Sequence, residues 1–192
     1  HYGLKTGETG MIITPSESAG YLKREMMSSF GWDFSAMEKE GTLAIVDVTD
    51  PVLRLQKSID VDPVEFLINF RKLVERKLAE FRPERLFIDD LTAFFMAVEK
   101  PFLVRSLTDD LFGTIRSSGT TSVVTMGTAF GTNQFLEYGA DSATMLSRDR
   151  IGNNLIRSIF IMKMRGSKIA NSIRVLDISD EGISVSSLSP YP

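Results

Sequence analysis

Cysteine is absent from the 192 residues of the chain, and histidine occurs once, at position 1. The first absence excludes disulfide bonds, thiol nucleophiles and zinc sites built from cysteine, and the second argues against histidine-based catalysis. No apolar run approaches the roughly 20 residues that a membrane-spanning helix needs, and no secretory signal peptide is recognisable near the start. These absences predict a cytoplasmic protein that does not enter a membrane.

The charge of the chain is slightly negative. Lys and Arg number 22 against 25 Asp and Glu, which gives a formal net charge of −3 and a pI near 5.3. Without a basic stripe, this balance argues against a broad surface for nucleic acid or acidic membranes. With 43% hydrophobic and 24% charged residues, the length suits one compact domain over residues 1–192.

The sequence is organised around an apolar run that ends in two carboxylates, Leu86-Phe87-Ile88-Asp89-Asp90. Continuous apolar runs are typical of parallel strands that helices cover on both faces, and ligands bind beyond the carboxyl ends of such strands. Asp89 is therefore a candidate Walker B acid, the carboxylate that holds the water shell of a nucleotide-bound Mg²⁺. The alternative is that Asp89 only ends the strand, because its short side chain satisfies a turn.

The other patterns alternate between short apolar strands and amphipathic helices, and then change to strands alone. A helix tail over 1–8 is followed by strands predicted at 10–14, 42–48 and 121–126 and helices at about 16–30, 62–81 and 102–116. We interpret 52–61 as a surface excursion and 127–133 as a small-residue loop. Beyond Ser142 we expect antiparallel hairpins with strands at 143–146, 158–165, 173–178 and 183–186. The fold class is thus α/β, with a mainly parallel sheet and a C-terminal antiparallel hairpin extension.

Glu17 lies where the first predicted strand gives way to a helix. Ser16 or Ser18 has the side chain of a helix N-cap, so a carboxylate between them is favoured by the dipole at the helix N-terminus. The functional interpretation is that Glu17 is a base that polarises an attacking water. The sequence alone leaves both interpretations open.

Lys163 and Arg165 are two positions apart in a predicted strand, so both side chains lie on one face. Two cations so placed repel each other mildly, and an anion between them would remove that repulsion. The alternative is a charged strand end that discourages edge-to-edge pairing.

Taken in order, these segments resemble the RecA-superfamily ATPases, and most closely the KaiC-like proteins of archaea and bacteria. The resemblance depends on strand-Glu17-helix, strand-Asp89, Glu137-Tyr138-Gly139-Ala140-Asp141 and Lys163-Met164-Arg165-Gly166, and it runs along nearly the whole chain. It implies a RecA-like P-loop NTPase core that binds Mg²⁺ and ATP, forms a homo-oligomeric ring such as a hexamer, and has a regulatory or signalling role with an unidentified protein partner.

The resemblance also implies residue roles. Asp89 would position Mg²⁺, Glu17 would activate the attacking water, and Lys163 and Arg165 would reach the phosphates bound by the neighbouring subunit. ATP hydrolysis would therefore take place between subunits.

The sequence departs from the family pattern at several points. The phosphate-binding motif G-x-x-x-x-G-K-[ST] occurs nowhere, Ser16 replaces a common second Glu, and Met126-Gly127 replaces a frequent Ser-Gln. In the family the motif lies just upstream of the segment that matches residues 1–10, so we expect that an N-terminal P-loop portion is missing. ATPase activity is expected only if that portion is present. The alternatives are a degenerate, non-catalytic interaction or assembly protein and, third, a recombinase-like DNA-binding paralogue.

Overall fold

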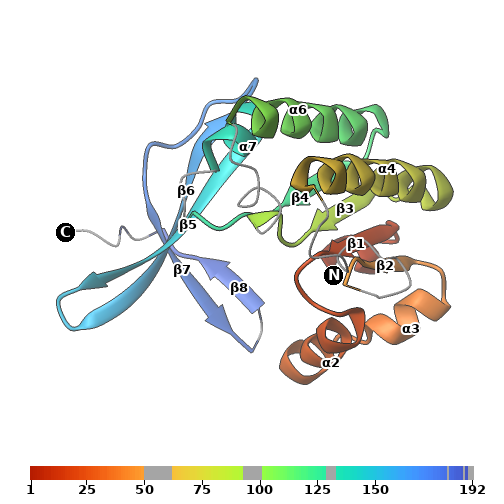
Figure 1. Cartoon of the computed structure of the whole chain (residues 1–192). Helices are drawn as coiled ribbons and strands as arrows, with labels where there is room; N and C mark the ends of the chain where they lie inside the picture. Colours follow the sequence, from red (N-terminus) through yellow and green to blue (C-terminus); the bar gives the residue numbers. More distant parts are fainter. Residues whose placement is uncertain (50–61, 93–100, 129–132, 181, 188, 190–192) are drawn as a thin grey trace. The chain divides into compact units, whose positions relative to one another are not determined.

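The computed structural model of the chain describes residues 1–49, 62–92, 101–128, 133–180, 182–187 and 189 (Figure 1). The predicted excursion over 52–61 and most of the predicted loop over 127–133 lie outside the described residues. The chain divides into two compact units, residues 1–139 and 140–192, and each is described by itself. The single domain expected from the length stays a prediction.

The first unit contains a parallel sheet with the strand order β2-β1-β3-β4. The strands are β1 (Gly10–Thr14), β2 (Leu43–Asp47), β3 (Arg85–Ile88) and β4 (Thr121–Val124), all within the ranges expected from the apolar runs or one residue beyond them. Every pairing among them is parallel. The predicted α/β architecture with a parallel sheet is therefore confirmed.

The helices of this unit are α1 (Tyr2–Lys5), α2 (Ala19–Phe30), α3 (Phe34–Lys39), α4 (Pro63–Phe81), α6 (Pro101–Ser117) and α7 (Asn133–Gly139). Among them, α2, α3 and α4 begin with a side-chain cap, from Ser18, Asp33 and Asp62. Asp62 caps α4 by accepting a hydrogen bond from Val64 N–H at 2.9 Å, as the Asp-Pro start predicts. The sequence analysis missed α3 and α7, which are too short for a helical periodicity to stand out.

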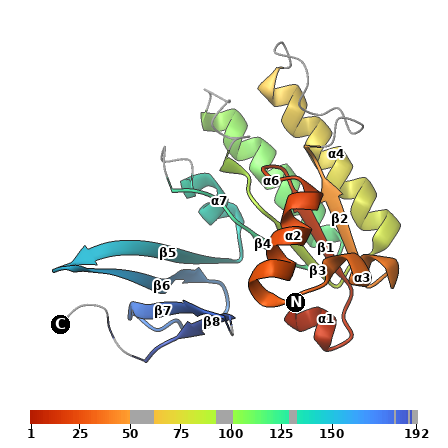
Figure 2. The same ribbon diagram turned by 90° about the horizontal axis from the view of Figure 1, so that it is seen from below.

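The two faces of the parallel sheet are covered differently. Figure 2 shows α4 and α6 side by side on one face, where Met11, Ile13, Leu86 and Ile88 are buried. On the other face Phe87 is only half-buried and Val123 is 57% exposed. The apolar run through Leu86 predicted cover on both faces, whereas the structure covers β3 completely on one face only.

The second unit is an antiparallel sheet with the order β5-β6-β7-β8. Its strands are β5 (Ser142–Ile151), β6 (Asn154–Met164), β7 (Arg174–Ser179) and β8 (Gly182–Val185). The hairpin extension is confirmed, but β5 continues five residues beyond its predicted end. Its second half, Ser147 to Arg150, carries charged side chains that hide the strand pattern in the sequence.

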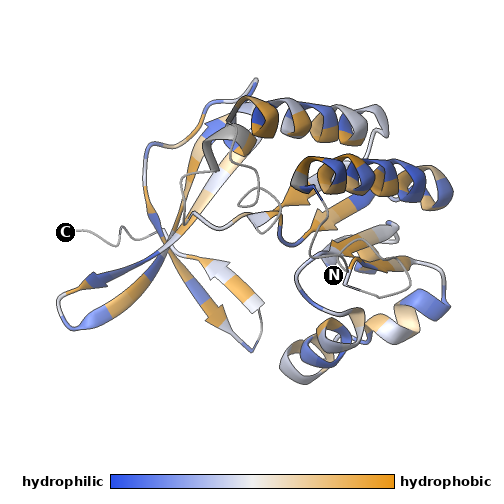
Figure 3. Ribbon diagram, in the orientation of Figure 1, coloured by the Kyte–Doolittle hydropathy of each residue, from blue (hydrophilic) through white to orange (hydrophobic). Residues whose placement is uncertain are grey.

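Figure 3 colours the strands and helices by hydropathy. Hydrophobic colour runs along β1 and β3, as expected for parallel strands, whereas α4 carries both colours, as expected for an amphipathic helix. No helix among the described residues is long and apolar enough to cross a membrane.

Arg82 ends α4 in the left-handed conformation, with φ of 51°. A Cβ makes this conformation costly, and glycine adopts it freely. We expect Arg82→Gly to raise the free energy of unfolding by about 0.5 to 1 kcal/mol, measured by urea denaturation. The control is Arg76→Gly in the middle of the same helix, which should lower it by about 1 kcal/mol. Destabilisation by both changes would contradict the prediction.

Candidate functional site

The carboxyl ends of the four parallel strands lie at one edge of the first sheet. Thr14 of β1 pairs in register with Asp47 of β2, and Ile13 pairs with Ile88 of β3, so Asp89 follows directly at the same edge. Val124 of β4 pairs with Ile88, which brings Thr125 beside Asp89. This edge is where ligands bind in parallel α/β sheets.

The main chain and side chain of Asp89 are both held at this edge. Its N–H donates to the carbonyl oxygen of Ile13 at 3.1 Å, and its own carbonyl oxygen accepts from the Ser16 hydroxyl at 3.2 Å. The Thr125 hydroxyl donates to the Asp89 carboxylate. The bond from Thr125 orients the carboxylate. Because Asp89 is exposed, the second carboxylate oxygen can accept further hydrogen bonds.

Glu17 is presented by a tight turn between β1 and α2. The Thr14 hydroxyl donates to the Glu17 carbonyl oxygen at 2.7 Å and accepts from the Glu17 N–H at 3.2 Å. These bonds fix the main chain of Glu17 and leave its exposed side chain without a hydrogen bond or ion pair to any described residue. A carboxylate so placed is free to accept a bond from water or a ligand.

Asp47 is a residue of this edge that the sequence analysis missed. Its carboxylate accepts from the Ala19 N–H at 2.7 Å, and from the N–H and hydroxyl of Thr49 at 2.8 and 2.6 Å. Ala19 is the first residue of α2, whose N-terminal N–H groups have no partner within the helix. Asp47 thus ties the start of α2, and the turn that carries Glu17, to the end of β2. The signal was an apolar strand ended by an acid, the same pattern that marks Asp89.

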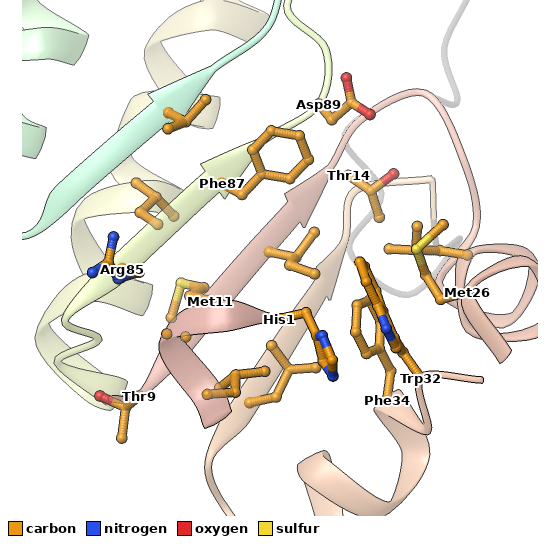
Figure 4. A pocket seen from close by; sticks show the side chains of 18 of the residues that line it. His1, Thr9, Met11, Thr14, Met26, Trp32, Phe34, Arg85, Phe87 and Asp89 are labelled. Carbon is orange, nitrogen blue, oxygen red and sulfur yellow. The ribbon is translucent and has the colours of Figure 1, made fainter. Parts of the chain in front are cut away.

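A pocket of about 550 Å³ connects these groups to the open face of the sheet. Figure 4 shows Thr14 and Asp89 at the carboxyl ends of their strands, with Phe87 in the sheet face and Trp32 and Phe34 across from it. Glu17 and Asp89 both line the pocket, so the structure brings these two predicted site residues together. The lining between its ends is mainly apolar.

Arg85, at the start of β3, lines the pocket away from Asp89 and forms an ion pair with Glu8. The Arg85 guanidinium donates to both oxygens of Glu8, at 2.9 Å for one of them. This hydrogen bond lowers the pKa of the Glu8 carboxyl group and raises the pKa of Arg85. Arg85 is the only cationic side chain among the described residues that line the pocket, and its charge is already matched.

Lys163 and Arg165 belong to the second unit, apart from Glu17 and Asp89 in the chain. The Lys163 ammonium donates to the Ala140 carbonyl oxygen at 2.8 Å, and Arg165 pairs with Asp141 at 3.2 Å. The Arg165–Asp141 pair is more than half exposed on both sides, so solvent screens it and it contributes little stability. Lys163 thus lies within β6 and Arg165 just after its end, and both cations contact the segment Ala140–Asp141.

The part of the chain that the structure describes contains no group of three or more His, Asp or Glu side chains that could hold a metal ion alone. Asp89 would offer a divalent cation one carboxylate. That donor set fits Mg²⁺, which keeps several waters and is bound by one or two carboxylates together with phosphates.

A comparison with protein families decides the affiliation. The family model described as "ATPase: KaiC" matches residues 2–189. The chain belongs to the KaiC family of ATPases. The sequence analysis inferred a KaiC-like protein from the segments around Glu17, Asp89 and Lys163–Arg165, and this family membership is confirmed.

Individual relatives agree with the KaiC affiliation. A UPF0273 protein of Pyrococcus horikoshii is 29% identical over 190 residues, which cover 95% of this chain and 76% of that protein. A UPF0273 protein of Thermotoga maritima is 29% identical over 191 residues, covering 94% and 76%. The crystal structure of a KaiC-like protein of Pyrococcus horikoshii superposes with a TM-score of 0.76 at 27% identity, covering 96% of this chain and 78% of that one. The RecA-like KaiC fold is therefore confirmed.

Asp47→Ala should lower the free energy of unfolding by about 1 to 2 kcal/mol, because the N–H groups of Ala19 and Thr49 lose their acceptor. Amide hydrogen exchange should speed up at these two residues and in the first turn of α2. The matched control is Asp33→Ala, which removes the cap of α3 (Asp33 accepts from Ala36 N–H at 2.9 Å) and should leave Ala19 protected. Equal exchange at Ala19 in both variants would contradict this role of Asp47.

Proposed function

We propose that this KaiC-family chain is part of an ATPase that binds Mg-ATP and hydrolyses it at an interface between subunits, in a regulatory or signalling context. The observation that carries the proposal is the joint placement of Glu17 and Asp89 in one pocket at the carboxyl edge of the parallel sheet. Their roles would be those of water-activating base and Mg²⁺-positioning acid. A cytoplasmic location remains the prediction made from the sequence.

The two carboxylates suit these roles because their supports differ. Asp89 is oriented by Thr125, as a side chain that holds one water of a metal shell must be. Glu17 is fixed only through its main chain, so its carboxylate can follow a water molecule. Asp89 would hold Mg²⁺ through its water shell, and the ion would supply neutralisation of the phosphate charge.

The pocket needs positive charge that its described residues do not provide. ATP phosphates beside Glu17 and Asp89 would meet two carboxylates, while Arg85 is paired with Glu8 at the far end. Lys163 and Arg165 of a neighbouring subunit would supply cations, as an arginine finger does in trans. We also place the phosphate-binding loop outside these 192 residues, which contain no such motif.

The rival function is a non-catalytic interaction protein of the same fold. Ser16 favours it, because a hydroxyl bound to the Asp89 carbonyl oxygen occupies the place of a second carboxylate. A protein of this kind would fail to bind nucleotide even with its natural N-terminus, whereas the proposed ATPase would bind it.

Asp89→Asn should weaken Mg²⁺-dependent nucleotide binding at least about tenfold, because the amide cannot hold the water shell of the metal as a carboxylate does. Isothermal titration of the natural-length protein with ATP, with and without Mg²⁺, measures the loss. The matched control is the adjacent Asp90→Asn, whose carboxylate accepts from the N–H and hydroxyl of Thr92 at 3.3 and 3.0 Å. Equal affinity in wild type and Asp89→Asn would remove the Walker B assignment.

Mixing two inactive variants tests whether the site is shared. Glu17→Gln and Arg165→Ala should each abolish turnover while nucleotide binding is retained. In a random equal mixture about a quarter of the interfaces combine an intact Glu17 with an intact Arg165 of the next subunit, so the turnover rate should recover to about that fraction of wild type. The control is a chain that carries both Glu17→Gln and Arg165→Ala. Mixed with either single variant it should give no activity, because no interface then has both an intact Glu17 and an intact Arg165. No recovery would show that Arg165 acts within its own subunit or not at all.

A further inference from the structure

The two acids that follow β3 have different hydrogen-bond partners. Both oxygens of the Asp90 carboxylate accept from Thr92, one from its N–H at 3.3 Å and the other from its hydroxyl at 3.0 Å. The Asp89 carboxylate accepts from the Thr125 hydroxyl and lines the pocket, whereas Asp90 does not line it. Thr92 therefore binds the Asp90 carboxylate within its own turn, and Asp89 is left as the acid that can face a ligand.

The Thr92 hydroxyl also joins this turn to the segment that follows β4. A hydroxyl has one proton to donate, and the Asp90 carboxylate accepts it. The same oxygen accepts from the Gly127 N–H at 2.8 Å. Because threonine is stiff about χ1, bonds on both sides hold its hydroxyl in one orientation. We call the contacts among Asp90, Thr92 and Gly127 the Thr92 clamp.

Thr125 lies in the segment that the Thr92 clamp holds. Its N–H and its carbonyl oxygen bond to main-chain groups at and after the end of β3, at 3.0 and 3.2 Å. Its hydroxyl donates to the Asp89 carboxylate. Gly127 is two residues further along the chain, so its bond to Thr92 limits how far Thr125 can move away from Asp89.

The Thr92 clamp needs a close approach of the main chain at Gly127. A Cβ at this position would lie 3.2 Å from the Thr92 hydroxyl oxygen, which is tighter than an ordinary van der Waals contact. Without a side chain, the N–H of residue 127 reaches Thr92 freely. Met126-Gly127 is also where the sequence departs from the frequent Ser-Gln of the family, so a main-chain donor stands here in place of a polar side chain.

We propose that Thr92 is a positioning residue of the Mg²⁺ site, which acts on Asp89 through Gly127 and Thr125. The inference rests on the proposed function, because the metal-binding role of Asp89 does. Outer partners that orient a ligating carboxylate contribute to metal affinity. Thr92 does not line the pocket, so its loss should change binding only as far as it changes Asp89.

Isothermal titration of the natural-length protein with ATP, with and without Mg²⁺, tests the positioning role. Thr92→Val keeps the shape of the side chain without the hydroxyl, and should weaken Mg²⁺-dependent binding by roughly three- to tenfold. Binding without Mg²⁺ should stay unchanged. Thr92→Ser restores the hydroxyl and should bind as the wild type does. In the Asp89→Asn background Thr92→Val should cause no further loss, because residues that act through one another are not additive.

The matched control is Thr42→Val, which removes another half-buried threonine hydroxyl. Thr42 donates to the Met37 carbonyl oxygen at 3.1 Å and precedes β2, at the edge of the sheet opposite to Asp89. This variant should leave the Mg²⁺ dependence of binding unchanged. Asp90→Asn also leaves the Thr92 clamp in place, because an asparagine keeps one oxygen for the Thr92 hydroxyl.

Three results would overturn the inference. These are unchanged binding in Thr92→Val, failure of Thr92→Ser to restore binding, and an equal loss from Thr92→Val in the wild-type and Asp89→Asn backgrounds. Circular dichroism checks that Thr92→Val is folded, and Thr92→Ala decides the question if it is not.

Crystal structures without nucleotide separate this inference from the proposed function. Thr92→Val should lose the contact between Asp89 and Thr125, and Thr92→Ser should keep it. A wild-type protein that binds no Mg-ATP, together with a lost contact in Thr92→Val, would contradict the proposed function and leave the positioning of Asp89 by Thr92 intact. Mg²⁺-dependent binding in the wild type, together with an intact contact in Thr92→Val, would contradict this inference alone.

Discussion

The register of the parallel ladder is the constraint on which the candidate site depends. Hydrogen bonds between β1 and both of its neighbours align Thr14 with Asp47 and Ile13 with Ile88. A slip of one residue would turn Asp89 to the opposite face, where α4 and α6 cover the sheet. The burial of Met11, Ile13, Leu86 and Ile88 on that face opposes such a slip. The core thereby determines which face receives the carboxylates.

Sequence patterns could predict this edge because both signals are local. Apolar runs of four or five residues identify the strands, and an acid at the end of such a run identifies the edge that binds ligands. Asp89 was found in this way, and Glu17 by its place between the first strand and the helix that follows it. Lys163 and Arg165 were found by their period-two spacing in a predicted strand over 158–165, whereas β6 ends at Met164 and includes only Lys163.

Other parts of the site depend on pairing between distant residues, and no single-sequence pattern reports such pairing. Thr125 contacts Asp89 only because β4 pairs with β3, and Asp47 contacts Ala19 only because β2 pairs with β1. Arg148 and Arg157 come to face each other in the same way, since they are nine positions apart in the sequence and pair only across β5 and β6. The sequence analysis followed the chain in order, whereas Arg148, Arg150, Arg157 and Arg174 come from three strands, β5, β6 and β7.

The charged residues that the proposed reaction needs are divided between the two units. The acids that would handle metal and water lie in residues 1–139, and the cations that would neutralise phosphate lie in residues 140–192. Within the pocket the described residues present three carboxylates, Glu17, Glu25 and Asp89, and the Arg85 cation that is paired with Glu8, an arrangement that repels a polyphosphate. Exposed charges attract strongly only when water is excluded from between them. A neighbouring copy that covers the pocket with its own cations would provide both conditions, charge balance and exclusion of water, so the assembly and the chemistry would depend on the same contact.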